Sequence, residues 1–163
     1  MPEFEVTIDT NVFVHLFNIK NNNEDAHIDK LLSSLVDRRA TLCVDDKGRM
    51  KGEYVTHVVP LIKKASDETL KVYWLRYLME YNEWHSIPVD FGDQLMVSIR
   101  RVLVIAERSD HVFVYVAIGS NTVLVSNNAI HITHYRNELR KCAKKCGSKV
   151  SDFLSSRQAV AAL

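Results

Sequence analysis

Side chains that carry oxygen ligands occur at four points where a predicted strand passes into a helix or where a predicted helix begins. These residues are Asp9, Glu53, Asp110 and Asn128. A carboxylate at such a point is either the N-cap of a helix or a ligand for a metal ion or substrate. Carboxylates that meet at one edge of a sheet repel one another unless a cation neutralises them. The expected cation is Mg²⁺ or Mn²⁺, because both ions prefer oxygen ligands and keep water molecules that can act as nucleophiles.

The pattern of apolar residues predicts the elements that position these side chains. Alternating or compact apolar runs predict strands at 4–8, 41–44, 86–89, 122–126 and 149–150. Helical spacing predicts helices at 12–17, 24–38, 49–65, 67–84, 93–106, 110–118 and 135–146, and a closing segment capped by Ser151. Strands that alternate with helices pair in parallel through right-handed crossovers. We therefore expect an α/β fold, a three-layer α/β/α sandwich with a mainly parallel sheet of four or five strands, built as a single domain over residues 1–163.

A few residues define the boundaries of these elements. Pro60 is expected to kink or divide the helix that contains it, and the segment 45–48 is expected to form a turn. Pro88 suits an edge strand, because proline removes a hydrogen-bond donor from the ladder. The segment 110–118 is rich in β-branched and aromatic residues, so a strand is the alternative to a helix there.

The composition is that of an ordinary globular domain. The chain has 163 residues, of which 47% are hydrophobic and 25% charged, enough to fill one core. The formal net charge of +1 neither indicates nor excludes a nucleic-acid partner. The sequence has neither an apolar run of the roughly 20 residues that a membrane span needs nor a recognisable secretory signal. Its number of cysteines is odd, so it does not suggest a framework of disulfide bonds. We therefore expect a cytoplasmic protein without a membrane partner.

Taken in order, the same positions resemble the motifs of PIN-domain ribonucleases. The segments that carry the resemblance are Ile8-Asp9-Thr10-Asn11, Val44-Asp45-Asp46-Lys47-Gly48-Arg49-Met50, Gly52-Glu53-Tyr54, Asp110 with Val112–Ala117, and Val123–Asn128. Each motif is short, but they follow one another at fitting intervals and span most of the chain. The resemblance implies a parallel sheet flanked by helices and a metal-dependent cut of single-stranded or structured RNA.

The resemblance also implies roles for individual residues. The acids that hold Mg²⁺ or Mn²⁺ in the family fall on Asp9, Glu53 and Asp110. The family's fourth acid falls on Asn128, which keeps an oxygen ligand but lacks the negative charge, so a second ion should bind more weakly. Neighbouring hydroxyl and amide groups fall on Thr10, Asn11, Ser126 and Asn127.

A basic run lies in the predicted helix at 135–146. Its candidate phosphate-binding members are Arg136, Arg140, Lys141 and Lys144. Such a run is most often a solvated helix face, but it could hold RNA phosphates if it borders the acidic edge of the sheet. A set of histidines and cysteines in the same region differs in spacing from zinc fingers, which makes ordinary helix residues the better interpretation. That set is His131, His134, Cys142 and Cys146.

Two functional hypotheses follow from these residues and from the resemblance. The first is a metal-dependent endoribonuclease, either a toxin or an RNA-processing or defence nuclease. Its partners would be RNA, an antitoxin or another protein, and a second copy of the chain in a homodimer. The alternative is a catalytically weakened PIN-like domain that binds RNA or a protein partner without cleavage, and Asn128 favours it. A receiver-like phosphoacceptor domain fits less well, because Asp9 follows the first strand.

Overall fold

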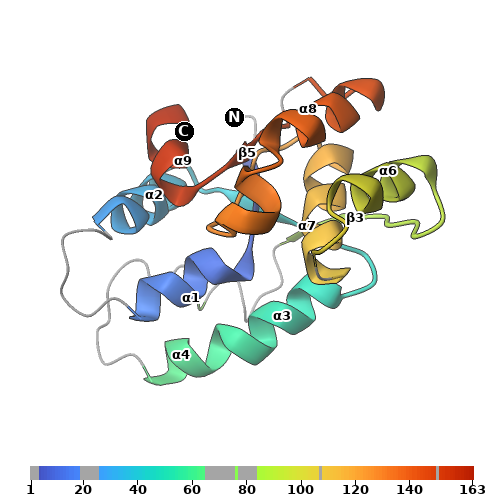
Figure 1. Cartoon of the computed structure of the whole chain (residues 1–163). Coiled ribbons are helices and arrows are strands. Elements are labelled where there is room, and N and C mark those ends of the chain that lie inside the picture. The colour runs from blue at the N-terminus through green and yellow to red at the C-terminus, as the bar shows by residue number, and fades with distance from the viewer. Residues whose placement is uncertain (1–3, 19–25, 65–75, 77–83, 107, 150) are drawn as a thin grey trace.

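The computed structural model describes residues 4–18, 26–64, 76, 84–106, 108–149 and 151–163. Its centre is a five-stranded sheet in the order β3-β2-β1-β4-β5, in which every neighbouring pair is parallel (Figure 1). The strands are β1 (Glu5–Ile8), β2 (Thr41–Asp45), β3 (Trp84–Ile87), β4 (Leu124–Val125) and β5 (Phe153–Leu154). The predicted parallel sheet is therefore confirmed.

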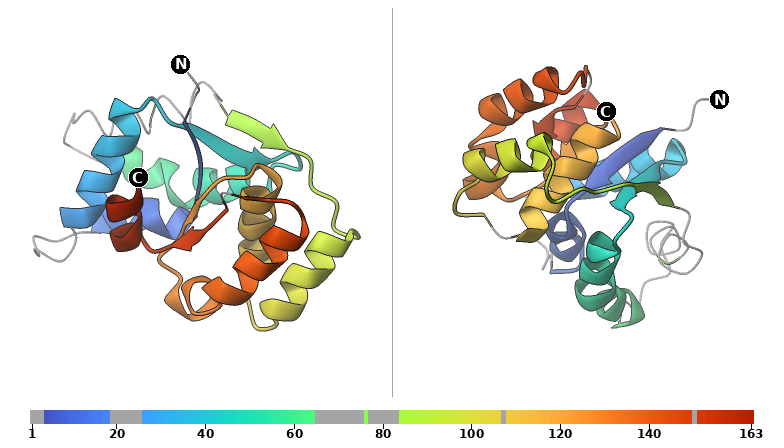
Figure 2. Two further views of the ribbon diagram at one scale, coloured as in Figure 1. Left: turned by 90° about the horizontal axis from the view of Figure 1, so that it is seen from above. Right: turned by 90° about the vertical axis from the view of Figure 1, so that its right-hand side faces the viewer.

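Helices cover both faces of the sheet, as the two views in Figure 2 show, which confirms the predicted three-layer α/β/α fold. One layer contains α1 (Thr10–Asn18), α2 (Ala26–Asp37), α3 (Arg49–His57), α4 (Val59–Lys64) and α9 (Ser156–Ala162). The other layer contains α6 (Gln94–Val102), α7 (Arg108–Gly119) and α8 (Arg136–Lys145). A π-helix, η2 (Ala129–Thr133), joins β4 to α8. No prediction corresponds to η2; apart from it and the corrections below, these elements match the predicted segments with shifted boundaries.

The helix α7 is buried on all sides, which explains why its sequence also fits a strand. Every residue from Asp110 to Ile118 is buried, because α7 contacts β1, β2 and β4 on one side and α6 on the other. A helix in this position needs no polar face, so it tolerates many β-branched and aromatic residues. The helix prediction for 110–118 is confirmed, and the strand alternative is wrong.

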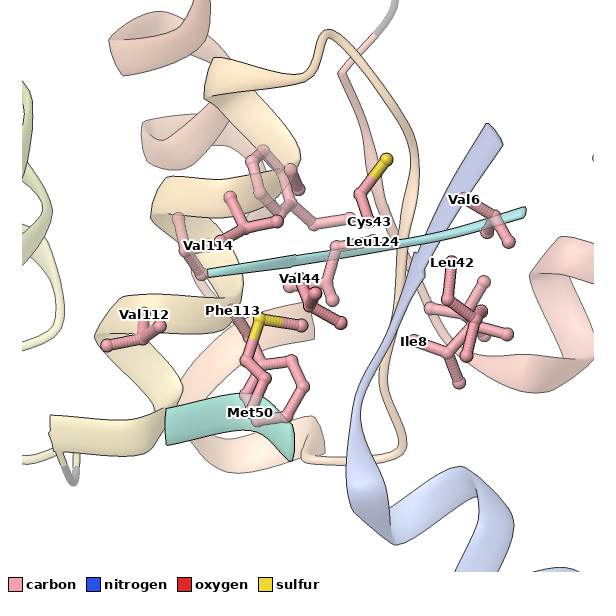
Figure 3. Packing of buried hydrophobic residues seen from close by; sticks show 14 of the residues in the cluster. Val6, Ile8, Leu42, Cys43, Val44, Met50, Val112, Phe113, Val114 and Leu124 are labelled. Carbon is pink, nitrogen blue, oxygen red and sulfur yellow. The ribbon is translucent and has the colours of Figure 1, made fainter. Parts of the chain in front are cut away.

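The sheet separates two regions of the hydrophobic core. Figure 3 shows the side chain of Cys43 on the opposite side of β2 from Leu42, as the alternation of a strand requires. The ring of Tyr54 lies 5.6 Å from that of Phe13 and 6.2 Å from that of Phe113, measured between centroids. These aromatic contacts fix α1, α3 and α7 relative to one another. α1 follows Asp9, α3 carries Glu53 and α7 carries Asp110.

The predicted helix that contains Pro60 is divided just before this proline. α3 ends at His57 with Val58 as its C-cap, and Pro60 lies in the first turn of α4, where the backbone N–H that proline lacks has no partner within the helix. The predicted turn at 45–48 is also present. Asp45 ends β2, and its carboxylate accepts hydrogen bonds from the backbone N–H groups of Arg49 (2.9 Å) and Met50 (2.7 Å), which starts α3.

The third strand begins earlier than the sequence predicted. Trp84 was expected to end a helix at 67–84, but it opens β3, where it pairs with Leu42 and stacks on Tyr54 at 5.8 Å. Contacts with residues distant in sequence therefore override the local helical pattern. Most of the predicted helix at 67–84 lies outside the described residues. β3 is an edge strand, as predicted, and Pro88 follows it directly.

Two predictions near the end of the chain are wrong. The last strand, β5, does not include Lys149 and pairs with β4 further along the chain, whereas Val150 of the predicted strand lies outside the described residues. Ser151 is not a helix cap; its hydroxyl donates to the backbone oxygen of Ala117 at 2.9 Å. Instead, Ser155 caps α9, and its hydroxyl accepts from the N–H of Gln158 at 3.2 Å. The reciprocal bond from the backbone of Ser155 to the Gln158 side chain completes a capping box.

Candidate functional site

The acidic edge of the sheet lies where β1 and β4 end. These strands are parallel neighbours, with Ile8 paired to Val125. Their carboxyl ends therefore place Asp9, directly after β1, beside Ser126, directly after β4. α1 and α3 begin at this edge because they follow β1 and β2, and α7 begins here because it runs back toward the start of β4 (Figure 1). The carboxyl edge of a parallel sheet is where ligands bind in open α/β folds.

Three side-chain and backbone groups hold the carboxylate of Asp9. Its Oδ2 accepts hydrogen bonds from Oγ of Ser126 at 2.7 Å and from Nδ2 of Asn11 at 3.0 Å. Its Oδ1 accepts from the backbone N–H of Asn11 at 3.3 Å, so Asp9 also caps α1. The Oδ1 of Asn11 in turn accepts from the backbone N–H of Asn127 at 3.0 Å. Asp9 is thus both the helix cap and a fixed carboxylate at the acidic edge.

The electrostatic environment of Asp9 disfavours its negative charge. Only 5% of the residue is exposed, and burial is the main reason why its pKa rises from 3.8 to about 6. The hydrogen bonds from Ser126 and Asn11 oppose this rise, whereas the charges of Asp110 and Glu53 add to it. The charges of Asp110 and Glu53 therefore repel that of Asp9 in the folded chain. A cation placed near Asp9 would lower that repulsion.

Asp110 lies in the first turn of α7 and is linked to Asp9 through hydrogen-bonding side chains. Nδ2 of Asn128 lies 3.4 Å from each carboxylate oxygen of Asp110. The backbone N–H of Asn128 donates to Oγ of Ser126 at 3.0 Å, and Ser126 donates to Asp9. Nδ1 of His131 lies 3.5 Å from Oδ2 of Asp110. The predicted residues Asp9, Ser126, Asn128 and Asp110 are therefore connected in one network.

The contact between His131 and Asp110 was not predicted from the sequence. Asn128 caps η2 by accepting the backbone N–H of His131 at 3.1 Å, and this cap holds the histidine at the acidic edge. Asn128, three residues before His131, is a residue type that caps helices and could have been recognised in the sequence. The proximity of His131 to Asp110 depends on the fold. Among the described residues, no group of three His, Cys, Asp or Glu ligand atoms within 4.8 Å of one another includes His131, His134, Cys142 or Cys146.

Glu53 lies beside an open cavity between α3 and α7. Its carboxylate is 3.6 Å from Nε2 of His57, one turn further along α3. The cavity has a volume of about 510 Å³ and is lined by Arg49, Gly52, Glu53, Thr56, His57, Arg108 and Ser109. The guanidinium of Arg49 stacks on the ring of Phe91 at 4.3 Å. Two arginines thus lie at the same cavity as one of the predicted acids.

The predicted acids interact through their charges but do not form a closed ligand shell. Among the described residues, a single group of His, Cys, Asp or Glu has three ligand atoms within 4.8 Å of one another, and it is Glu5, Cys43 and His85. Asp9, Glu53 and Asp110 are therefore too widely spaced to be three direct ligands without side-chain movement. Mg²⁺ keeps several of its waters, so an acid can also bind such an ion through water.

Two further residues beside Asp9 contribute to this edge. Thr10 is buried, and its Oγ1 has no hydrogen-bond partner among the described residues. A buried hydroxyl of this kind is a donor that water or a ligand can use. The hydroxyl of Tyr54 donates to the backbone oxygen of Ile8 and so holds the end of β1. This role of the Tyr54 hydroxyl was not predicted from the sequence, although Tyr54 directly follows Glu53.

The predicted phosphate-binding residues on α8 lie apart from Glu53. Arg136 forms two hydrogen bonds to Asp152, at 2.6 and 2.7 Å, and Nε of Arg140 lies 3.9 Å from the same carboxylate. A second cavity, of about 340 Å³, is lined by Asn137, Arg140, Lys141 and Lys144. Figure 1 shows α8 well separated from α3. The basic residues of α8 therefore form a surface separate from the cavity beside Glu53.

Asn127 connects elements rather than facing the acids. Its Oδ1 accepts hydrogen bonds from the backbone N–H of Ser156 at 3.0 Å and from the Ser156 hydroxyl at 2.8 Å. Its Nδ2 lies 3.2 Å from Nδ1 of His15. Asn127 thus ties the end of β4 to α9 and α1, and its predicted substrate role stays a prediction.

Comparison with known proteins does not assign the site. No protein-family model, curated protein or solved structure matches the chain. In the part of the chain that the structure describes, no helix is both long and apolar enough to cross a membrane. Function must therefore be argued from the chemistry of the acidic edge itself.

Proposed function

We propose that the chain is a PIN-like, metal-dependent endoribonuclease that hydrolyses RNA phosphodiester bonds with Asp9, Glu53 and Asp110 around Mg²⁺ or Mn²⁺. One observation carries this proposal. Burial, with the charges of Asp110 and Glu53 adding to it, raises the pKa of Asp9 to about 6. Acids with such perturbed pKa values concentrate at functional sites. The available ligands are oxygens, which suit a hard divalent ion.

The side chains around the acids are suited to prepare the reaction. A bound ion would supply a water of lowered pKa as the nucleophile and would offset negative charge on the phosphate. Ser126 holds one oxygen of Asp9, and Asn128 faces both oxygens of Asp110, which restricts the orientation of the two carboxylates. The hydroxyl of Thr10 could donate a hydrogen bond to a water or to a phosphate oxygen.

The cavity beside Glu53 supports an anionic substrate. Arg49 and Arg108 line it together with Glu53, and guanidinium groups pair with phosphate through charge-assisted hydrogen bonds. Within this proposal, the protein acts in the cytoplasm on single-stranded or structured RNA. It would do so as an RNA-processing or defence nuclease, or as a toxin held by an antitoxin or another protein partner.

A cleavage assay with matched acid-to-amide variants tests the proposal. We expect the wild-type chain to cut RNA with Mn²⁺ and to stop when EDTA removes the ion. Asp9→Asn should lower the rate more than about a hundredfold, because even changes in the outer shell of a metal site cost about 10- to 100-fold. Asp37→Asn, at the exposed end of α2, is the matched control and should cut like wild type. Equal rates for wild type and Asp9→Asn would contradict the assignment.

The alternative is a domain that binds RNA or a protein without cutting, and the amide of Asn128 in place of a fourth acid favours it. Following the melting temperature during a Mn²⁺ titration separates the two functions. An ion that binds only the folded chain raises the melting temperature by mass action. RNA binding without cleavage and without a Mn²⁺ response would support the alternative.

A further inference from the structure

A second cluster of ligand-type side chains lies away from the acidic edge. It consists of Glu5 on β1, Cys43 on β2 and His85 on β3, which are consecutive strands of the sheet. Their ligand atoms all lie within 4.8 Å of one another. We propose that these three side chains bind a borderline-soft divalent cation of the zinc class. This site is independent of the proposed ribonuclease function.

The sheet register brings the three side chains to one face. Cys43 and His85 are paired directly in the β2–β3 ladder, so their side chains leave the same face of the sheet. Oε1 of Glu5 lies 2.6 Å from Nδ1 of His85. The carboxylate of Glu5 therefore reaches across β2 to a histidine two strands away, on the face that carries Cys43. That face is opposite to Leu42, as Figure 3 shows for Cys43.

The spacing of the three groups is close to that of a tetrahedral metal site. Zinc bonds of about 2.0 to 2.3 Å place neighbouring ligand atoms about 3.3 to 3.8 Å apart. The pair formed by His85 and Glu5 must open by about 1 Å to reach this spacing. Both side chains have room to move, because 49% of His85 and 29% of Glu5 are exposed. Their exposure also leaves access for water as a fourth ligand.

The chemistry of the set selects the ion. A thiolate, an imidazole and a carboxylate suit Zn²⁺, whereas Mg²⁺ prefers oxygen ligands alone. A metal ion binds cysteine as the thiolate, so an ion that binds here must displace the proton of the Cys43 thiol. We therefore expect metal binding at this site to release a proton.

The end of α7 lies close to Cys43. Ser120 directly follows the last residue of α7, and its hydroxyl lowers the pKa of the Cys43 thiol against the larger effect of burial. The C-terminal end of a helix carries a partial negative charge, which favours a cation in its vicinity. The charges of Glu5 and of an ionised Cys43 act in the same direction.

Cobalt absorption tests the thiolate ligand in the full-length chain. Cys142→Ser combined with Cys146→Ser leaves Cys43 as the last of the chain's 3 cysteines. In this background, Co²⁺ should produce a saturable thiolate-to-cobalt charge-transfer band that Zn²⁺ displaces. Adding Cys43→Ser should remove the band. A background chain that is folded by circular dichroism but gives no band overturns the proposal.

Calorimetric titration with Zn²⁺ tests the histidine without changing the buried cysteine. His85→Ala is expected to fold, because His85 is half exposed on an edge strand. Its Zn²⁺ affinity should fall more than about tenfold, since the loss of even an outer-shell partner commonly costs that much. His134→Ala removes an exposed histidine elsewhere and should bind Zn²⁺ like wild type. Equal affinities for His85→Ala and His134→Ala overturn the site.

Discussion

The side-chain amide of Asn128 lies 3.4 Å from both carboxylate oxygens of Asp110. The other end of the same side chain accepts the backbone N–H of His131 at 3.1 Å and caps η2. Asn128 therefore links the start of the π-helix to the acid in α7. In the proposed PIN-like site this position would carry a fourth acid; with the amide in its place, Asp110 has a hydrogen-bond donor beside it instead of a second negative charge.

Replacing Asn128 with Asp separates these two roles. Asp is as good an N-cap as Asn, so η2 should keep its start. The new carboxylate would face Asp110, and two like charges at this distance need a cation or a proton. We expect Asn128→Asp to melt at a lower temperature than wild type in EDTA and to gain more from Mn²⁺. A variant whose melting temperature responds to Mn²⁺ no more than wild type contradicts this account of Asp110.

The raised pKa of Asp9 predicts how the stability of the metal-free chain changes with pH. The pKa of Asp9 is about 6 in the folded chain, against an ordinary value of 3.8, so between these pH values the folded chain binds more protons than the unfolded chain. Stability contributed by protonated Asp9 is lost as pH rises from about 4 to 6, by up to about 3 kcal/mol.

The variant Asp9→Asn lacks this titration. The unfolding free energies of the variant and of wild type are measured by urea unfolding in EDTA, at about pH 4 and at about pH 8. Relative to wild type, the variant should be more stable at pH 8 than at pH 4 by about 3 kcal/mol, because only wild type loses stability as Asp9 ionises. Adding Mn²⁺ at the higher pH should stabilise wild type alone. A free-energy difference that stays constant with pH would contradict the raised pKa of Asp9.

The two basic cavities make different predictions for RNA cleavage. Arg108 lines the cavity of Glu53, whereas Lys144 lines the cavity on α8. Arg108→Gln should lower kcat/KM on a short RNA about tenfold, the equivalent of one charge-assisted hydrogen bond. Lys144→Gln, the matched control, should leave kcat/KM on the same RNA unchanged. The reverse result would place the scissile phosphate next to α8.

The ion pair between Arg136 and Asp152 predicts a different pH dependence. Burial alone would raise the pKa of Asp152, but hydrogen bonds and charge from Arg136 outweigh it, and the pKa is lowered. The stability that this pair contributes is therefore present above the ordinary Asp pKa and is lost as pH falls through the lowered value. Asp152→Asn should be less stable than wild type at neutral pH, by about 1 to 3 kcal/mol, and the gap should close in acid. A gap that is the same at both pH values contradicts this role.

The sequence was sufficient to predict a parallel sheet and the side chains that follow two of its strands, β1 and β4. Asp9 and Ser126 come directly after apolar runs, so parallel pairing alone brings them to one edge. The sequence could not show that Trp84 belongs to β3, because its contacts with Leu42 and Tyr54 come from distant parts of the chain. Local helical periodicity favoured the wrong element.

Two groups of neighbouring side chains could not be predicted from the sequence, and the physical reason is the same for both. Glu5, Cys43 and His85 come from separate strands, and the register that unites them is not visible in local spacing. His131 meets Asp110 because a π-helix follows β4, and the sequence analysis did not anticipate that π-helix. Contacts within one segment could be predicted, whereas contacts that depend on register or on the start of an unusual helix could not.

A crystal soaked in Mn²⁺ and measured for anomalous scattering tests the central claim most directly. The claim is that folding gathers Asp9, Glu53 and Asp110 around one divalent cation. We predict a manganese peak at the acidic edge, with an oxygen of Asp9 and an oxygen of Asp110 bound to it directly or through one water. A map without a manganese peak beside Asp9, whether or not peaks occur elsewhere, would contradict the account.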